Sequence, residues 1–344
     1  MSLALVTGAT GLVGSHIVER LLADGWDVRA LARNPERARL ELPPSVHLAH
    51  GDVLDSRAFA RAAEGATAIF HTAANIIVRG GWEAYRVTNI DGTRNALAAA
   101  ELARARLLQI SSVAVYGPSA RYAAAERGEK THEGVPLPPL REGAYYARSK
   151  RDSEALVLAA HREGRVWATA VRPDVIYGKR DRQFVPRMAL LVSRAVIPLL
   201  HGGRSTMAIV HAANVADGAV RAVTTDAAGG KAYNLANDFD VSVRRFFELA
   251  GEGLGRRPVF LPMPLWLARG ALRGVKWVSR ALTGGRFNLV STSTLDFISR
   301  DNPFTSDLAR QELGWNPAVR PEIGVPEAFR DWRLRRAGNK KGAT

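Results

Sequence analysis

The feature that most constrains the fold of this chain is a glycine-rich turn near its start. An apolar segment at 3–7, too short for a helix, leads directly into Gly8, Gly11 and Gly14. Beyond the glycines, apolar residues recur at helical spacing as far as Leu22, which predicts an amphipathic helix. A strand, a tight glycine turn and a helix in this order can hold a dinucleotide, because the free N–H groups at a helix N-terminus favour phosphate.

Each glycine has its own role in such a turn. Gly8 bends the chain without a Cβ penalty, Gly11 lets the backbone approach a pyrophosphate, and Gly14 lets the helix lie against the strand. The predicted cofactor contacts of this segment are Thr7, Gly8, Thr10, Gly11, Leu12, Val13 and Gly14.

The end of the second predicted strand, at 26–33, indicates which dinucleotide binds. A carboxylate about 20 residues past the glycines would hold the ribose 2′-hydroxyl of NAD, whereas an arginine suits a 2′-phosphate. This strand ends in Arg33, and no acid occupies its end. The sequence therefore favours NADP(H) and leaves NAD(H) open, the alternative being an arginine that contacts only solvent.

Further strands are expected at 46–50, 66–71, 107–112 and 166–171, and they alternate with helices through residue 178. This alternation predicts an α/β fold with a Rossmann-type, doubly wound parallel sheet. Residues that follow the strands are expected to contact the cofactor: Asp52 and Val53 at the adenine, and Thr72, Ala73 and Ala74 beside the ribose and diphosphate.

The regular alternation ends after residue 178, which predicts a second, smaller lobe. We expect 1–178 to form the NADP-binding domain, with 205–235 returning to it. The substrate-binding lobe is expected to comprise 179–204 and 236–330, and the polar tail 331–344 is expected to be disordered.

Two side chains one helical turn apart indicate proton transfer. Tyr146 and Lys150 project from the same face of a predicted helix, and a nearby ammonium favours the phenolate. We expect Lys150 to lower the pKa of Tyr146, so that the phenol exchanges a proton with a substrate hydroxyl. Ser112, at a strand end, can hydrogen-bond the same oxygen. Tyr145 is a weaker candidate, because the residue four positions after it is Ser149 and not a lysine. Ser111 is weaker than Ser112, because Ser112 stands at the end of the strand.

Asn89 is a further candidate for the catalytic site. It lies in a mostly apolar stripe of an expected helix at 83–103, and a buried amide needs hydrogen-bond partners. We expect it to brace the loop after the next strand, at 107–112.

Composition excludes several other kinds of site. The 344 residues contain no cysteine, so no disulfide, thiolate metal site or cysteine nucleophile is expected, and no metal is predicted. The net charge of +15 attracts anions of every kind, but no nucleic-acid-binding module accompanies it, so no nucleic-acid partner is expected. No secretion signal or run of about 18 apolar residues is present, which predicts a cytoplasmic protein.

Taken together, the motifs resemble those of the extended short-chain dehydrogenase/reductase superfamily, of the NAD-dependent epimerase/dehydratase type. The resemblance covers nearly the whole chain. It implies a Rossmann fold, a Ser/Tyr/Lys mechanism, and backbone contacts from Pro173 to Val175 with the nicotinamide. The matching residues are Thr7-Gly8-x-x-Gly11-x-x-Gly14, Asp52-Val53, Asn89, Ser112, Val115-Tyr116-Gly117, Tyr146-x-x-x-Lys150, Arg172-Pro173 and Leu313-Gly314-Trp315-Asn316-Pro317.

Within that superfamily, segments 178–187 and 210–216 are most similar to the 3β-hydroxysteroid dehydrogenase and dihydroflavonol reductase branch. This resemblance implies an oxidoreductase that interconverts a secondary alcohol and a ketone on a small hydrophobic substrate, which is sterol-like, flavonoid-like or long-chain. Two alternatives stay open: a nucleotide-sugar epimerase or dehydratase with tightly bound NAD(P), and a cofactor-binding module without catalysis.

The segment 264–280 places Arg269, Arg273, Lys276 and Arg280 on one helical face, among tryptophans and aliphatic residues. Such a helix either lies on an anionic membrane or covers an apolar substrate cleft with its charges in water. A homodimer seam formed by the predicted helices at 83–103 and 144–161 is compatible with the sequence, as is a monomer.

Overall fold

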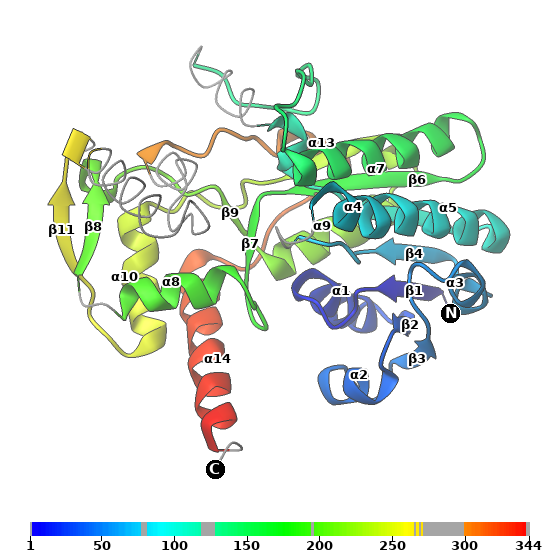
Figure 1. Cartoon of the computed structure of the whole chain (residues 1–344), viewed down its shortest axis with the longest axis horizontal. Coiled ribbons are helices and arrows are strands. Elements are labelled where there is room, and N and C mark those ends of the chain that lie inside the picture. The colour runs from blue at the N-terminus through cyan, green and yellow to red at the C-terminus, as the bar shows by residue number, and fades with distance from the viewer. Residues whose placement is uncertain are drawn as a thin grey trace. The chain divides into compact units, whose positions relative to one another are not determined.

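A computed structural model gives the fold of this chain and describes residues 2–76, 81–117, 128–193, 196–264, 266–267, 270 and 299–341. Its main sheet has seven strands in the order β10-β6-β5-β4-β1-β2-β3, all paired in parallel (Figure 1). These strands are β1 (Leu3–Thr7), β2 (Asp27–Ala32), β3 (His47–His50), β4 (Ala68–His71), β5 (Arg106–Ile110), β6 (Ala168–Pro173) and β10 (Ala232–Leu235).

Helices cover both faces of this sheet, as predicted for a doubly wound fold. One face packs against α1 and α9 through a core that includes Val6, Ile17 and Val215, and the other packs against α3, α5 and α7 around Leu5 and Phe59. The helices of this region are α1 (Leu12–Ala23), α2 (Pro35–Glu41), α3 (Ser56–Ala63), α4 (Gly81–Tyr85), α5 (Gly92–Ala103), α7 (Tyr145–Arg162), α9 (Ala212–Thr224) and α13 (Asp307–Leu313), with short helical turns η1 (Arg86–Asp91), η2 (Val113–Tyr116) and η5 (Asp226–Ala228).

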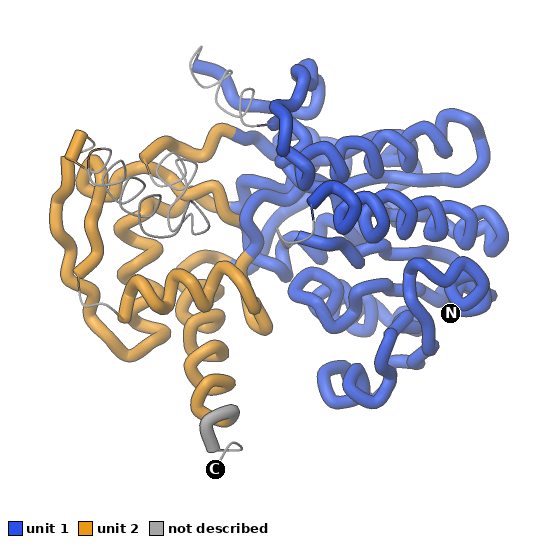
Figure 2. Tube along the Cα trace, viewed as in Figure 1, with its two compact units in different colours: residues 1–176, 210–238, 304–319 blue, residues 177–209, 239–303, 320–344 orange. Residues whose placement is uncertain are grey.

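The chain divides into two compact units (Figure 2). Unit 1 comprises 1–176, 210–238 and 304–319 and contains the main sheet. Unit 2 comprises 177–209, 239–303 and 320–344. It contains α8 (Phe184–Val192), η4 (His201–Gly203), α10 (Val243–Leu254) and α14 (Pro321–Lys341), and a parallel pair of strands, β8 (Val196–Leu200) and β11 (Val259–Met263). A third sheet pairs β7 (Val175–Tyr177) with β9 (Ile209–His211).

The structure corrects two of the predicted domain boundaries. Residues 304–319 belong to unit 1, because Ala309, Leu313 and Trp315 are buried in the core between the main sheet and its helices. The predicted disordered tail at 331–344 is also wrong for most of its length, since α14 continues to Lys341. Val325, Ala328 and Phe329 are buried in this helix, and its polar continuation hid it from the sequence pattern.

Within the described residues, no helix is long and apolar enough to cross a membrane. The cytoplasmic location stays a prediction.

Candidate active site

The glycine turn has the conformation that the sequence predicts. Gly8 has a φ of +64°, which L side chains rarely adopt, and its amide oxygen accepts a hydrogen bond from the Gly11 N–H at 2.8 Å. A Cβ added at Gly14 would lie 2.2 Å from the Gly8 oxygen. Side chains at positions 8 and 14 are therefore excluded, which lets α1 begin directly against the end of β1.

The first turn of α1 fits a phosphate group. Its N-cap residue is Gly11, which offers no side-chain cap, and no acidic residue lies in the first turn. The predicted contacts Leu12 and Val13 are half-buried there, and Thr10 lies in the turn that precedes them. An uncapped helix N-terminus presents free N–H groups, which is the arrangement that a dinucleotide diphosphate needs.

The end of β4 is tied to the end of β1 beside this turn. Thr7 Oγ1 hydrogen-bonds His71 Nδ1 at 3.0 Å, and the Thr72 hydroxyl donates to the Thr7 carbonyl at 2.6 Å. The Ala73 N–H donates to Thr7 Oγ1 at 3.3 Å, and Cβ atoms added at Gly8 would touch Thr72 and Ala73. The structure thus brings the predicted contacts Thr7, Thr72 and Ala73 against the glycine turn, with Ala74 next in sequence.

Lys150 is buried beside these strand ends. Its ammonium donates a hydrogen bond to the Ile110 carbonyl at the end of β5, at 2.7 Å. Burial lowers the pKa of Lys150 to about 8, against an opposing effect of the Glu154 carboxylate. Burial and the charge of Lys150 also lower the pKa of His71 to about 3, so this imidazole is neutral at physiological pH.

Ser112 lies next to the Tyr146 phenol, and hydrogen bonding by its hydroxyl lowers the pKa of Tyr146. Burial has the larger, opposite effect, and the neighbouring Tyr85 adds to it, so the pKa of Tyr146 is raised overall. We expected Lys150 to lower the pKa of Tyr146, and this expectation is wrong. The Lys150 ammonium binds the Ile110 carbonyl, and the pKa of Tyr146 is raised, so the phenol stays protonated at neutral pH.

The neighbouring candidates lie elsewhere. Tyr145 is exposed and its ring lies 6.2 Å from that of Trp82, whereas Ser111 is buried with a hydroxyl that has no hydrogen-bond partner in the described structure. The geometry brings together Ser112, Tyr146 and Lys150 at the carboxyl end of the sheet. Their catalytic roles stay predictions.

Comparison with known proteins identifies the family. Residues 4–236 match the NAD dependent epimerase/dehydratase family, which is well over half of the chain. This protein belongs to that family. It is thus an enzyme of the NAD(P)-dependent short-chain dehydrogenase/reductase type, and the predicted resemblance and fold class are confirmed.

Relatives of this epimerase/dehydratase family member act on differing substrates. A 4-hydroxy-2-methyl-3-oxo-4-farnesyl-3,4-dihydroquinoline-1-oxide ketoreductase of Stigmatella aurantiaca is 29% identical over 93% of this chain and 93% of its own. A 3 beta-hydroxysteroid dehydrogenase/Delta 5-->4-isomerase of Mycobacterium tuberculosis is 28% identical over 94% of this chain and 89% of its own. The latter is of the branch that the sequence indicates.

A solved structure shares the fold. The UDP-glucuronic acid 4-epimerase from Bacillus cereus, in complex with NAD, superposes with a TM-score of 0.70 at 17% identity, covering 96% of this chain and 99% of that one. At this identity the likeness establishes the architecture alone.

Asn89 of this family member has a different role from the one predicted. It lies in η1, a π-helical turn between α4 and α5, and it braces the loop after β4 rather than the loop after β5. Its Oδ1 accepts from the Asn75 N–H at 2.6 Å, and its Nδ2 donates to the Asn75 carbonyl at 3.0 Å and to Ser149 Oγ at 2.9 Å. The sequence pattern revealed a buried amide but not which loop it meets.

The predicted 2′-phosphate contact lies at the ends of β2 and β3. The Arg33 side chain is 83% exposed, and its Nε is 3.9 Å from the Asp52 carboxylate. Val53 is half-buried and packs against Gly92, where an added Cβ would lie 3.3 Å from the Val53 side chain. The Val53 carbonyl accepts a hydrogen bond from Asn95 Nδ2 at 2.9 Å. The Arg33 side chain thus lies mostly in solvent, with a long ion pair to Asp52.

A buried polar network behind the site was missed by the sequence analysis. Arg172, at the end of β6, forms an ion pair with Glu154 of α7 at 2.6 Å, and both side chains are buried. Arg172 also donates to the Tyr116 hydroxyl at 2.9 Å, which in turn donates to Asn234 Oδ1 at 2.8 Å. The network holds two segments in place. One is the end of β6, where the predicted contacts Pro173 and Val175 follow Arg172, and the other is the loop after β5, which contains Ser112 and Tyr116. Glu154 stands four residues after Lys150, a spacing that could have revealed it.

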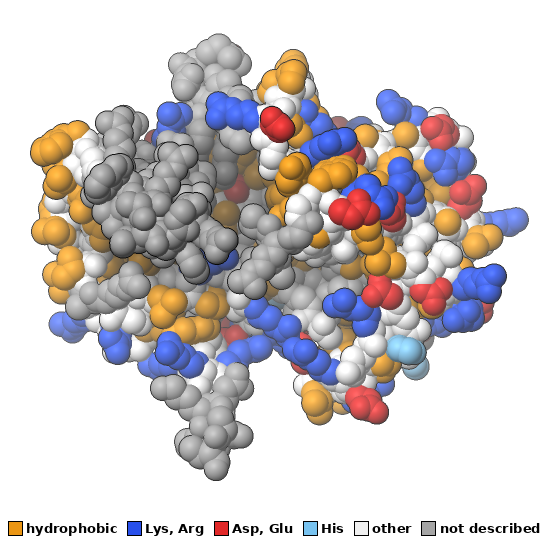
Figure 3. Space-filling view, in the orientation of Figure 1, with side chains coloured by type: hydrophobic (Ala, Val, Ile, Leu, Met, Phe, Trp, Pro, Cys, Tyr) orange, Lys and Arg blue, Asp and Glu red, His pale blue; other side chains and the backbone are white. Residues whose placement is uncertain are grey.

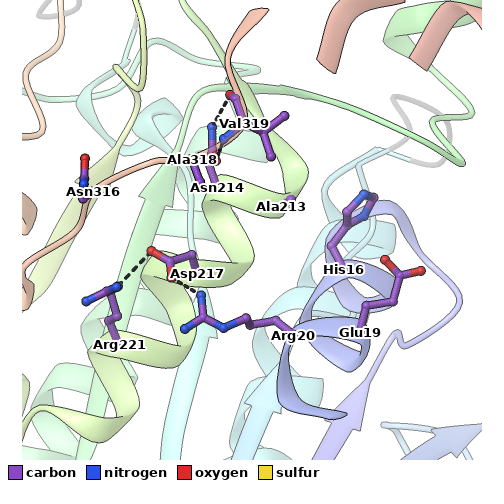
Figure 4. A pocket seen from close by; sticks show the side chains of 10 residues that line it. All are labelled: His16, Glu19, Arg20, Ala213, Asn214, Asp217, Arg221, Asn316, Ala318 and Val319. Atoms are coloured by element: carbon purple, nitrogen blue, oxygen red, sulfur yellow. Dashed lines mark hydrogen bonds and ion pairs between the residues drawn. The ribbon is translucent and has the colours of Figure 1, made fainter. Parts of the chain in front are cut away.

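A pocket of about 370 Å³ lies in unit 1 away from these residues (Figure 4). His16, Glu19 and Arg20 of α1 and Asn214, Asp217 and Arg221 of α9 contribute to its lining. The carboxylate of Asp217 pairs with Arg20 and Arg221, so these charges are satisfied within the protein (Figure 4). Because α1 and α9 cover the face of the sheet opposite to α7, this pocket is separate from Tyr146 and Lys150.

No cluster of His, Cys, Asp or Glu that could hold a metal ion occurs among the described residues. The absence of a metal site stays a prediction for the whole chain.

Proposed function

We propose that this enzyme is an NADP(H)-dependent oxidoreductase that interconverts a ketone and a secondary alcohol on a small hydrophobic substrate. The observation that carries the proposal is the buried Lys150 ammonium, which binds the Ile110 carbonyl at 2.7 Å at the carboxyl end of β5, where Ser112 follows the strand and lies next to Tyr146. The ketoreductase and steroid dehydrogenase relatives, whose names specify a farnesyl compound and a hydroxysteroid, support a hydrophobic substrate.

The residues divide the proton transfer between them. When bound, the nicotinamide cofactor supplies or accepts the hydride. Tyr146 gives its proton to the carbonyl oxygen in reduction, and a Ser112 hydrogen bond orients that oxygen. Lys150, whose ammonium binds the Ile110 carbonyl, supplies a buried positive charge at the carboxyl end of β5.

Tyr146→Phe tests the mechanism, with Tyr145→Phe as the matched control. We expect Tyr146→Phe to lower kcat by about 100-fold or more, since general acid–base catalysis contributes about that factor, while cofactor binding is unchanged. Tyr145→Phe, at an exposed ring outside the site, is expected to leave kcat unchanged. Oxidation of NADPH with a panel of apolar ketones, read at the nicotinamide band, measures both. A Tyr146→Phe enzyme with most of its activity would exclude Tyr146 from the mechanism.

The same assay distinguishes the alternative. Conversion of a UDP-sugar without net change at the nicotinamide band would indicate an epimerase, and binding of the cofactor without either reaction would indicate a non-catalytic module.

Arg33 is proposed to select NADP(H) through the 2′-phosphate. Charge-assisted hydrogen bonds contribute about 1.5–3 kcal/mol, so Arg33→Asp is expected to weaken NADPH binding about 10- to 100-fold and to leave NADH binding intact or improved. Arg37→Asp is the control, since Arg37 lies nearby on α2 and is exposed. Fluorescence titration with each dinucleotide gives the two Kd values. An unchanged NADPH Kd for Arg33→Asp would overturn this assignment.

A further inference from the structure

Unit 2 carries an apolar surface on its two-stranded sheet. Val196 pairs with Val259 and Pro198 with Leu261, so these four side chains share one face of β8 and β11. Val196, Val259 and Leu261 are 47%, 59% and 53% exposed, whereas Ile197, on the opposite face, is buried. We call these four residues the apolar face.

Other exposed apolar residues of unit 2 adjoin this face in sequence. Leu190 and Leu191 stand at the end of α8, shortly before β8, and the Arg256 guanidinium, shortly before β11, donates to the carbonyl of Ser193 at 3.3 Å. Trp266, just beyond β11, is 73% exposed. Figure 3 shows hydrophobic side chains gathered over β8 and β11. The exposed aliphatic side chains that share one face of β8 and β11 mark an interaction surface, unlike apolar residues that are exposed singly.

The charge of the two segments that form the apolar face has one sign. Residues 182–209 contain four arginines and no Asp or Glu, and residues 253–295 contain seven Lys and Arg and no Asp or Glu. Of these basic residues, Arg256 and Arg257 are exposed directly before β11. A surface that combines aliphatic side chains, an exposed tryptophan and exposed arginines matches an anionic lipid interface, where the apolar groups enter the lipid and the cations meet the headgroups.

We propose that the apolar face of β8 and β11 docks on a membrane that contains anionic lipid. The aliphatic side chains argue against nucleic acid, whose phosphates and base edges call for polar and aromatic contacts. The predicted membrane helix at 264–280 lies largely outside the described residues, so the proposal rests on the strands instead. It does not depend on the reaction catalysed, and the binding test below needs neither cofactor nor substrate.

Sedimentation with lipid vesicles tests this surface. We expect the wild-type protein to bind vesicles of phosphatidylglycerol and phosphatidylcholine in equal amounts, and to bind vesicles of phosphatidylcholine alone at least about tenfold more weakly, because each basic residue near an anionic surface contributes about fivefold. Raising the salt concentration from about 0.1 M to about 1 M is expected to weaken binding to the anionic vesicles, because the screening length shortens from about 10 Å to about 3 Å.

Two pairs of variants separate the apolar and the electrostatic contributions. Val259→Glu with Leu261→Glu is expected to lower binding to the anionic vesicles at least about tenfold, and Arg256→Glu with Arg257→Glu is expected to do the same. The matched controls lie in unit 1 on exposed positions: Leu40→Glu with Leu102→Glu for the leucine and valine changes, and Arg57→Glu with Arg61→Glu for the arginine changes. Circular dichroism verifies that each variant is folded.

Three results would overturn the proposal. They are a wild-type protein that does not bind the anionic vesicles, equal losses in the unit 1 controls, and a dimer in solution that the Val259→Glu, Leu261→Glu variant dissociates. The last result would assign the apolar face to a second copy of the chain.

Discussion

Units 1 and 2 differ in how far they bury an Arg–Glu ion pair and a tryptophan. In unit 1, the Arg172–Glu154 ion pair is buried and Trp315 is enclosed in the core. In unit 2, the Arg244–Glu248 pair is partly exposed and Trp266 stands in solvent. Unit 1 thus removes this ion pair and this tryptophan from water, whereas unit 2 leaves their counterparts at its surface. The difference indicates that residue type alone does not predict what a substitution does.

The largest contrast is expected between Arg172→Ala and Arg244→Ala. Removing Arg172 leaves the Glu154 carboxylate buried without its partner, which costs about 3–5 kcal/mol of unfolding free energy. Removing Arg244 breaks a partly exposed pair and is expected to cost less than about 1 kcal/mol. Urea unfolding followed by circular dichroism measures both. Equal losses would contradict the distinction between the units.

The two tryptophans give a contrast of nearly the same size. Trp315 is buried and its Nε1 donates to the Asn214 carbonyl at 2.9 Å, so Trp315→Ala is expected to destabilise the protein by about 3–5 kcal/mol. Trp266→Ala is expected to change stability by less than about 0.5 kcal/mol, because its side chain is exposed. Thermal unfolding would refute this if the two variants melted together.

The lowered pKa of His71, in unit 1, predicts that acid destabilises the folded protein. Its pKa is about 3 in the folded protein and about 6.5 when unfolded, so the unfolded state binds more protons between these values. The free energy of unfolding is therefore expected to fall by about 1.4 kcal/mol per pH unit as the pH drops from 6.5 towards 3. Above pH 6.5, the contribution of His71 to this free energy does not change with pH.

The control for this pH effect is His71→Asn, which keeps a polar side chain without the titration. The wild-type minus variant difference in unfolding free energy, measured from pH 7 to pH 4.5, isolates His71 from the carboxylates. A difference that does not change with pH would show that His71 takes up a proton in the folded state.

The smallest change in the free energy of unfolding is expected from the loss of a helix N-cap, and it is expected to be the same in both units. Asp55 caps α3 in unit 1 by accepting from the Ala58 N–H at 3.0 Å, and Ser242 caps α10 in unit 2 by accepting from the Arg245 N–H at 3.1 Å. Either residue changed to alanine is expected to lose about 1 kcal/mol, because a cap depends on local backbone geometry. A large difference between the two variants would mean that tertiary packing governs even these caps.

The residues of the candidate site could be found from the sequence, but their electrostatics could not. Spacing placed Tyr146 and Lys150 on one helix face, and the strand pattern placed Ser112 at a strand end. The raised pKa of Tyr146 depends on burial and on the neighbouring Tyr85, and both follow from long-range packing. Asn89 was recognised as a buried amide for the same local reason, while its partner Asn75 was not.

The sequence by itself determined the strand, glycine turn and helix at the start, the parallel alternation that follows, and the family. These depend on backbone sterics and on periodicity within short segments, which are local. Tertiary structure alone decided that 304–319 join unit 1, that α14 runs to Lys341, and that Glu154 meets Arg172. Those features depend on contacts between residues distant in sequence, whose burial and pairing no local pattern records.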